Sequence, residues 1–166
     1  VLSKDQGLLG GGFGNPYDRH SFKDYQEVVN SGRFAFPVDE SKLDDRLSPG
    51  DQVFAVQVGQ KHTAYRLTGS PDSVINDSVA NRDIVVIIRE SGPSGFAFFA
   101  DVDGRSLGFS LVDGTLVDDE TKTVWNESGK AISGQLKGLQ LEAVPSRTSY
   151  WFSLVGSLPD IELRLL

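Results

Sequence analysis

Histidines and carboxylates are the side chains of this 166-residue chain that could do chemistry, because the sequence contains no cysteine. A zinc site would need both histidines, His20 and His62, together with carboxylates, and their spacing does not suggest one. A Ser-His-Asp triad is formally possible, but a histidine among many serines is common in any domain and does not by itself indicate one. The lack of cysteine also excludes disulfides, thiolate metal ligands and thiol nucleophiles. We therefore expect neither a bound metal nor a cofactor.

Acidic residues gather in two turns of the second half of the chain. The segment 101–104, Asp-Val-Asp-Gly, is similar to the start of a calcium loop, but its glycine comes too early and no glutamate closes the loop. This segment is more typical of an Asp-Gly hairpin turn. Asp113 and the run 118–120, Asp-Asp-Glu, could surround Ca²⁺. Because charge runs usually face water, we expect a solvated acidic face there instead.

Length and charge narrow the class of protein. The chain is long enough for one domain with a real core, and 39% hydrophobic with 23% charged residues is typical of a globular protein. The net charge of −7 argues against nucleic acid and anionic membranes as partners, since both demand a basic patch. No apolar run is long enough to span a membrane. The chain starts at Val1, so we expect that an initiator and a signal peptide or anchor were removed.

The elements that must position these residues are mainly strands. Two apolar runs, 84–88 and 96–99, are rich in β-branched and aromatic residues and indicate buried central strands. Glycine turns predict hairpins at Gly59-Gln60, Asp103-Gly104 and Asp113-Gly114. Residues 74–79 fit either a helical turn or a strand. Further strands are predicted at 139–144 and 161–166.

Helical periodicity is limited to short segments. Residues 21–30 predict a helix that ends at Gly32, and 39–47 indicate a helical turn. A third helix has its apolar face at 151, 154, 155 and 158 and is capped by Thr148 or Ser149. The predicted fold is thus mainly β (α+β), an antiparallel β-meander that forms a sandwich or a partly closed barrel with two or three short peripheral helices.

The first 16 residues differ in composition from the rest. They are rich in glycine around Leu8, Leu9 and Phe13, which indicates a flexible arm or linker. These three apolar side chains could dock on a neighbouring protein. We therefore predict an arm at 1–16 and a single β-rich domain at 17–166.

From Tyr65 onward the chain resembles a prokaryotic, mostly extracytoplasmic family known as domain of unknown function 3179. The matching motifs follow in order and with nearly ungapped spacing. They are Ala64-Tyr65-x-Leu67, Asn76-Asp77, Ile84-Val85-Val86, Val102-Asp103-Gly104-Arg105-x-Leu107-x-Phe109, Asp119-Glu120-Thr121 with Trp125, Gly129-x-Ala131-Ile132-x-Gly134-x-Leu136-x-Gly138-x-x-Leu141, Pro145-Ser146, Trp151 and Pro159-Asp160. The resemblance implies a location outside the cytoplasm: periplasmic, cell-surface or secreted.

The departures from the family concern its reactive residues. Read without gaps, the family's Cys-Pro-Leu-Cys falls on Arg89, Glu90, Ser91 and Gly92, and its histidine falls on Asp72. A Cys-x-x-Cys with a nearby histidine suits a soft-metal or redox site. All three groups are missing here, so this chain should not perform such chemistry by that route. The replaced positions form a possible vestigial site, and Asn76 and Asp77 are its possible neighbours.

Three functions follow from this interpretation. The first is a non-catalytic structural or binding module, a subunit of a larger extracytoplasmic assembly, for which a protein partner or self-assembly is expected. The second is a metal-binding or redox-related enzyme-like domain that uses the replaced site, with Asp72, Arg89 and Glu90. The third is a carbohydrate- or surface-binding domain that uses exposed aromatic rings.

Overall fold

The computed structural model describes residues 21–34, 37–91 and 94–165 of a chain that divides into two units, Val1–Val38 and Asp39–Leu166. In the first unit, helix α1 spans Ser21–Asn30, the predicted range. It ends as expected at Gly32, whose φ of +78° suits a residue without a Cβ. The predicted boundary after residue 16 stays a prediction. The following residues lie outside the described ranges: Leu8, Leu9, Phe13, His20 and Gly92.

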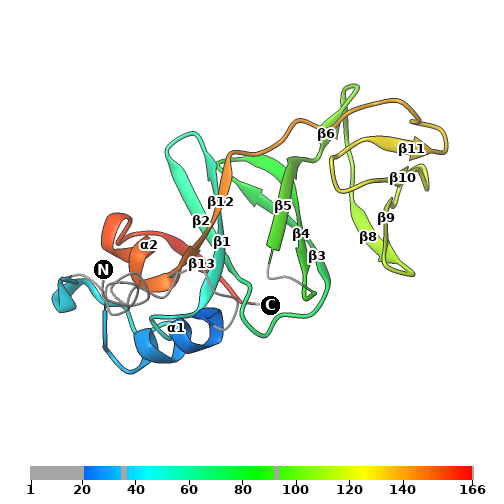
Figure 1. Cartoon of the computed structure of the whole chain (residues 1–166). Helices are drawn as coiled ribbons and strands as arrows, with labels where there is room; N and C mark the ends of the chain where they lie inside the picture. The colour runs from blue at the N-terminus through cyan, green and yellow to red at the C-terminus, as the bar shows by residue number, and fades with distance from the viewer. Residues whose placement is uncertain (1–20, 35–36, 92–93, 166) are drawn as a thin grey trace, which may run out of the picture. The chain divides into compact units, whose positions relative to one another are not determined.

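All the strands that the structure describes belong to the second unit (Figure 1). In chain order they are β1 Gln52–Val58, β2 Lys61–Arg66, β3 Ser73–Val79, β4 Arg82–Arg89, β5 Ser94–Phe99, β6 Asp101–Val102, β7 Arg105–Ser106, β8 Phe109–Val112, β9 Thr115–Asp118, β10 Val124–Trp125, β11 Ala131–Ser133, β12 Ser146–Tyr150 and β13 Glu162–Arg164. The helical elements of this unit are the 3₁₀ helix η2 Glu40–Lys42 and helix α2 Trp151–Ser157.

These strands form four sheets. The first sheet has the order β12-β1-β2-β13, the middle sheet β3-β4-β5 and the last sheet β11-β10-β9-β8, and β6 pairs with β7 in a short ribbon. The pairing is antiparallel except for β13, which runs parallel to β2. This fits the predicted antiparallel pattern, and the residues that fit a helix or a strand equally well form strand β3.

Strand β4 packs against a different neighbour on each face of the middle sheet. Its successive side chains point in opposite directions. Ile84, Val86 and Ile88 belong to a buried cluster that they share with one face of β1, whereas Val85 and Ile87 belong to a cluster shared with the last sheet. The middle sheet is therefore covered on both faces, as the unbroken apolar run of the sequence predicts.

The first sheet is also covered on both faces. Val53 and Ala55 of β1 and Ala64 of β2 pack against Trp151 and Leu154 of α2. The layers thus follow one another as α2, first sheet, middle sheet and last sheet (Figure 1). The sheets stack and do not close into a barrel, so of the two predicted arrangements the structure favours a layered sandwich.

Two-residue turns connect the hairpins where the sequence predicts them. Asp103 and Asp113 have φ values of 53° and 50°, and the glycine after each is also left-handed, at 71° and 75°. Both central residues with positive φ are typical of the tight turn that joins antiparallel strands. The Asp-Gly pairs are therefore turns, and the segment 101–104 is a hairpin rather than a calcium loop.

Two local predictions were wrong. Residues 139–144 alternate in hydrophobicity but contribute isolated bridges, such as Ala143 to Phe98, rather than a strand. The N-cap of α2 is Tyr150, without a side-chain cap bond, and Thr148 and Ser149 belong to β12. The first N–H groups of α2 need no capping side chain, because those of residues 151 and 152 donate to the carbonyls of residues 51 and 49.

Candidate functional site

Arg89, at the end of β4, is the centre of a charged cluster at the predicted vestigial site. Its Nη1 donates to Oδ2 of Asp72 at 3.0 Å, and its Nε donates to Oε1 of Glu127 at 2.8 Å. Its Nη2 donates to the carbonyl of Gly114 at 3.1 Å. The Arg89 side chain is only 16% exposed. Every nitrogen of its guanidinium group is therefore engaged within the protein.

The strands explain how these distant residues meet. Because β3 and β4 are antiparallel and Ser73 pairs with Ile88, Asp72 comes to lie beside the end of β4. There its Oδ1 accepts a hydrogen bond of 2.7 Å from the backbone N–H of Glu90. Glu127 lies in the connection between β10 and β11, so the cluster joins the middle sheet to the last sheet.

The electrostatics of the cluster favour fixed charges. The hydrogen bond to Glu127, followed by the one to Asp72, raises the pKa of Arg89 above its ordinary value, although burial opposes this. The backbone N–H of Glu90, followed by Arg89, lowers the pKa of Asp72. A carboxylate with a lowered pKa is a weak proton acceptor at neutral pH. The cluster is therefore better suited to holding layers together than to acid–base catalysis.

The other predicted site residues are only partly brought together. The backbone of Glu90 takes part in the cluster, but its side chain is exposed, as is Ser91. Among the described residues, no group of three or more histidine, aspartate or glutamate side chains could hold a metal ion. The sequence reasoning missed Glu127, whose position in a turn 38 residues away carries no signal of this contact.

Asn76 and Asp77 do not join the cluster, because they pair with Val85 and Ile84, which lie four and five residues along β4 from Arg89, and they face opposite sides of the sheet. Asn76 bonds the backbone of Phe109 in β8 twice, donating to its carbonyl and accepting from its N–H at 2.9 Å each. Oδ2 of Asp77 accepts from the Tyr65 hydroxyl at 2.8 Å and from Nε of Arg164 at 3.2 Å. The two side chains thus fasten the middle sheet to both of its neighbours.

The predicted solvated acidic face is wrong for Asp118, whose side chain is fully buried. Its Oδ2 accepts from Nε1 of Trp125 at 3.0 Å and from the N–H of Thr123 at 3.1 Å. Its Oδ1 accepts from the N–H of Thr121 at 2.6 Å, and the Thr121 hydroxyl bonds the same carboxylate. Burial raises the pKa of Asp118, but these hydrogen bonds outweigh burial and lower it. Asp118 is therefore a structural centre of the last sheet.

The neighbours of Asp118 are also used by the fold. The Asp119 carboxylate accepts from the Ser110 hydroxyl at 2.8 Å, and the Glu120 carboxylate accepts from the N–H of Gly108 at 3.0 Å. Both acidic residues are exposed, as expected, yet both tie the turn to the strand β8 region. The run 118–120 thus closes a turn with its own hydrogen bonds.

Comparison with protein families identifies the family of this chain. A family model described as "Protein of unknown function (DUF3179)" matches residues 1–160. The chain belongs to this family. The DUF3179 match starts well before Tyr65, so it also includes the segment in which the sequence motifs showed no resemblance. Neither the curated proteins nor the solved structures provided a match.

Within this DUF3179 member, the retained family motifs have structural roles. Asn76 joins two sheets, and Trp125 donates its indole N–H to Asp118. Gly129 has a φ of +78°, and a Cβ on it would come within 2.6 Å of the Phe98 ring. The two positions at which the sequence resemblance puts the family's histidine and first cysteine, Asp72 and Arg89, form an ion pair.

Two further findings bear on the alternatives. Trp125 and Trp151 are 2% and 0% exposed, so neither ring is available on the surface to stack on a sugar. In the described ranges, no helix is long and apolar enough to cross a bilayer.

Proposed function

We propose that this chain is an exported, non-catalytic module that serves as a structural or binding subunit of a larger extracytoplasmic assembly. The observation that carries the proposal is the Arg89 cluster. A permanent cation, paired with two carboxylates, lies where the family resemblance puts a cysteine. A cation held there opposes binding of a metal ion and cannot replace a thiolate as nucleophile.

The contrast between retained and lost residues supports the same proposal. Asn76, Trp125 and Gly129 match family motifs, and each one has a packing or hydrogen-bonding role in the layers. The lost residues are the ones with reactive side chains. A fold kept without its reactive groups is suited to presenting surfaces to a partner.

The enzyme-like alternative has a direct test on the same cluster. Metal content would be measured in the purified native protein and in the double variant D72N/E127Q, which removes both carboxylate charges beside Arg89. We expect no stoichiometric metal in either protein. A metal that is bound by the native chain and absent from the double variant would overturn the non-catalytic assignment.

The assembly role is tested by molar mass. Size-exclusion chromatography with light scattering would compare the full chain, of 18.0 kDa, with a chain that lacks residues 1–16. We expect the native chain to elute as a larger species or with a protein partner, and the truncation to weaken that species if the arm docks. A strict monomer without a co-purifying partner in both cases would count against the assembly.

A further inference from the structure

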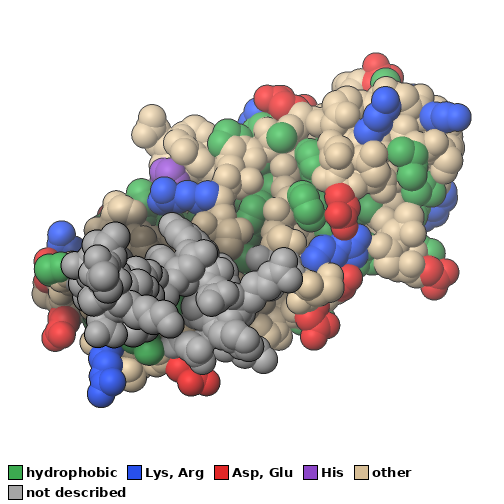
Figure 2. Space-filling view, viewed as in Figure 1, with side chains coloured by type: hydrophobic (Ala, Val, Ile, Leu, Met, Phe, Trp, Pro, Cys, Tyr) green, Lys and Arg blue, Asp and Glu red, His purple; other side chains and the backbone are tan. Residues whose placement is uncertain are grey.

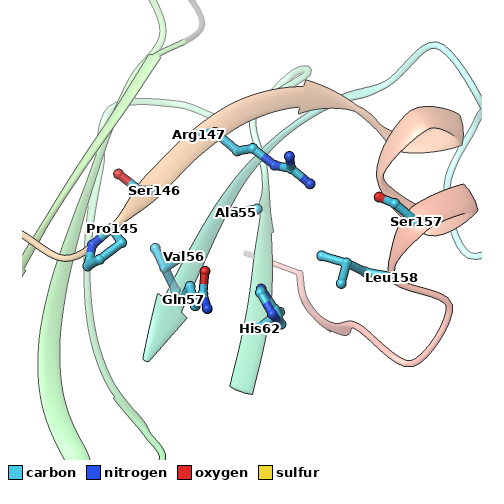
Figure 3. A pocket seen from close by; sticks show the side chains of 9 residues that line it. All are labelled: Ala55, Val56, Gln57, His62, Pro145, Ser146, Arg147, Ser157 and Leu158. Carbon is cyan, nitrogen blue, oxygen red and sulfur yellow. The ribbon is translucent and has the colours of Figure 1, made fainter. Parts of the chain in front are cut away.

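A cavity of about 390 Å³ lies on the first sheet, away from the Arg89 cluster in the middle sheet (Figure 3). Its lining includes Ala55 and Gln57 of β1, His62 of β2, Arg147 of β12 and Leu158 after α2. In the close-up view the side chains of Arg147 and His62 extend into the space between the strands and the end of α2. The volume is within the range of small-molecule sites.

The sequence explains why the sheet is hollow there. Arg147 of β12 pairs with Ala55 of β1, and Ala55 pairs with Ala64 of β2. Ala55 lines the cavity, and its small side chain leaves room beside Arg147, whereas Ala64 is fully buried in the cluster with α2. Helix α2 covers this face only as far as Ser157, and beyond it the backbone turns away at Leu158, whose C-cap ψ is 71°. The hollow is therefore formed by the small side chain of Ala55 and by the end of the short helix.

The charge of the lining is unusual for this protein. The chain has a net charge of −7, yet the residues that line this cavity include Arg147 and His62 and no carboxylate. Arg147 is exposed, and within the described residues its side chain forms no ion pair or hydrogen bond. On the face shown in Figure 2, the histidine coloured purple lies beside basic side chains. A second cavity adjoins the first through His62 and is lined by Lys61, Asp160 and Glu162.

A guanidinium group that has no partner among the described residues and lies above an apolar floor is suited to a particular ligand chemistry. The guanidinium fork donates two parallel hydrogen bonds to a carboxylate, and a neutral or charged imidazole can donate a further one. The floor offers the apolar side chains of Ala55, Pro145 and Leu158 to the rest of the ligand. A simple inorganic ion would satisfy the cation but would leave this apolar surface uncovered.

We propose that this cavity binds a small organic anion, a carboxylate on an apolar body, with Arg147 as the carboxylate-binding residue. The site is separate from the Arg89 cluster, because the two share no residue.

The test is a titration of the ¹⁵N-labelled full chain, followed by amide chemical shifts. The probes are benzoate, its uncharged analogue benzamide, and inorganic sulfate. We expect benzoate to produce saturable shifts at residues 55, 57, 62 and 147 with a dissociation constant in the millimolar range, and benzamide and sulfate to bind at least about tenfold more weakly.

Variants then assign the binding to Arg147. Arg147→Gln should weaken benzoate binding by at least about tenfold, because it removes the charged donor. Arg105→Gln is the matched control: it removes the same charge from an exposed position in the β6–β7 ribbon and should leave benzoate binding unchanged. Both side chains are exposed, so both variants should fold.

Several results would overturn the proposal. The first is an absence of saturable shifts with benzoate. The second is that sulfate binds as tightly as benzoate, which would mean an adventitious ion only, and the third is that benzamide does so. The fourth is that Arg147→Gln binds benzoate as tightly as the native chain. An equal loss in both arginine variants would also overturn it, since the effect would then be one of net charge.

Discussion

Replacing Asp118 by asparagine tests whether a buried carboxylate organises the last sheet. The asparagine side chain would keep the shape of the carboxylate but would carry one NH₂ group among N–H donors. In one orientation this group faces the N–H of Thr121, and in the other it faces those of Thr123 and Trp125. Each orientation leaves a buried donor unpaired, and the remaining bonds lose their charge. We expect the free energy of unfolding to fall by about 2–4 kcal/mol.

Urea denaturation followed by tryptophan fluorescence measures this loss. The matched control is Asp113→Asn, the same change in an exposed hairpin turn. Asp113 has a φ of 50°, a conformation that asparagine adopts readily, so this control should stay within about 0.5 kcal/mol of the native protein. The reasoning is refuted if the two variants unfold at the same urea concentration.

The pH dependence gives a second measurement on the same residue. Because the pKa of Asp118 is lowered in the folded protein, the carboxylate stabilises the fold fully at pH values above the unfolded-chain pKa of about 3.9. That contribution is lost as the pH falls through the folded-state pKa. The stability difference between the native protein and Asp118→Asn should therefore shrink below about pH 4. A difference that grows on acidification would contradict the assigned charge state.

Three further substitutions have defined outcomes. Arg89→Gln should lower the urea midpoint in dilute buffer, and it should lower it much less in about 1 M salt, because the carboxylate partners of Arg89 face solvent. An equal loss at both salt concentrations would contradict an ion-pair origin. Asn76→Ala should cost about 1–2 kcal/mol and speed hydrogen exchange at the Phe109 amide, whereas unchanged exchange would argue against the bond. Gly95→Ala would place a Cβ 2.5 Å from the Phe54 ring, so calorimetry should show a loss of about 2 kcal/mol, and an unaltered melting temperature would mean that the ring can move.

Local patterns in the sequence predict much of this fold. Helix α1 has the predicted bounds, and the Asp-Gly pairs at 103–104 and 113–114 form the expected turns, because positive φ at both positions is a local property of the chain. The apolar run of β4 correctly indicates a strand buried on both faces. The strand predicted at 139–144 was wrong, because an alternating pattern alone does not supply a neighbouring strand with which to pair.

The charged cluster depends on contacts between distant residues, whereas the Asp118 centre depends on burial that the local pattern does not show. The family resemblance placed Asp72 and Arg89 at related positions, and the pairing of β3 with β4 does bring them together. Glu127 joins them from another sheet, and no spacing rule links it to β4. Asp118 was expected to face water because charge runs usually do, but three nearby donors compensate its burial. These donors lie within seven residues of Asp118, but its burial depends on the tertiary structure.

Asn76 and Asp77 help to fix the register of strand β3, because each side chain needs particular hydrogen-bond partners. If β3 slipped by one residue in one direction, Asp77 would take the place of Asn76, and its carboxylate would face the carbonyl of Phe109, to which it cannot donate a hydrogen bond. In the other direction, Asn76 would take the place of Asp77, and an amide would replace the carboxylate beside the hydroxyl of Tyr65 and the guanidinium of Arg164. A slip in either direction thus creates a costly mismatch. Two adjacent polar residues thus discriminate against misfolded pairings on both faces of the middle sheet, in a strand whose apolar pattern is too weak to do so.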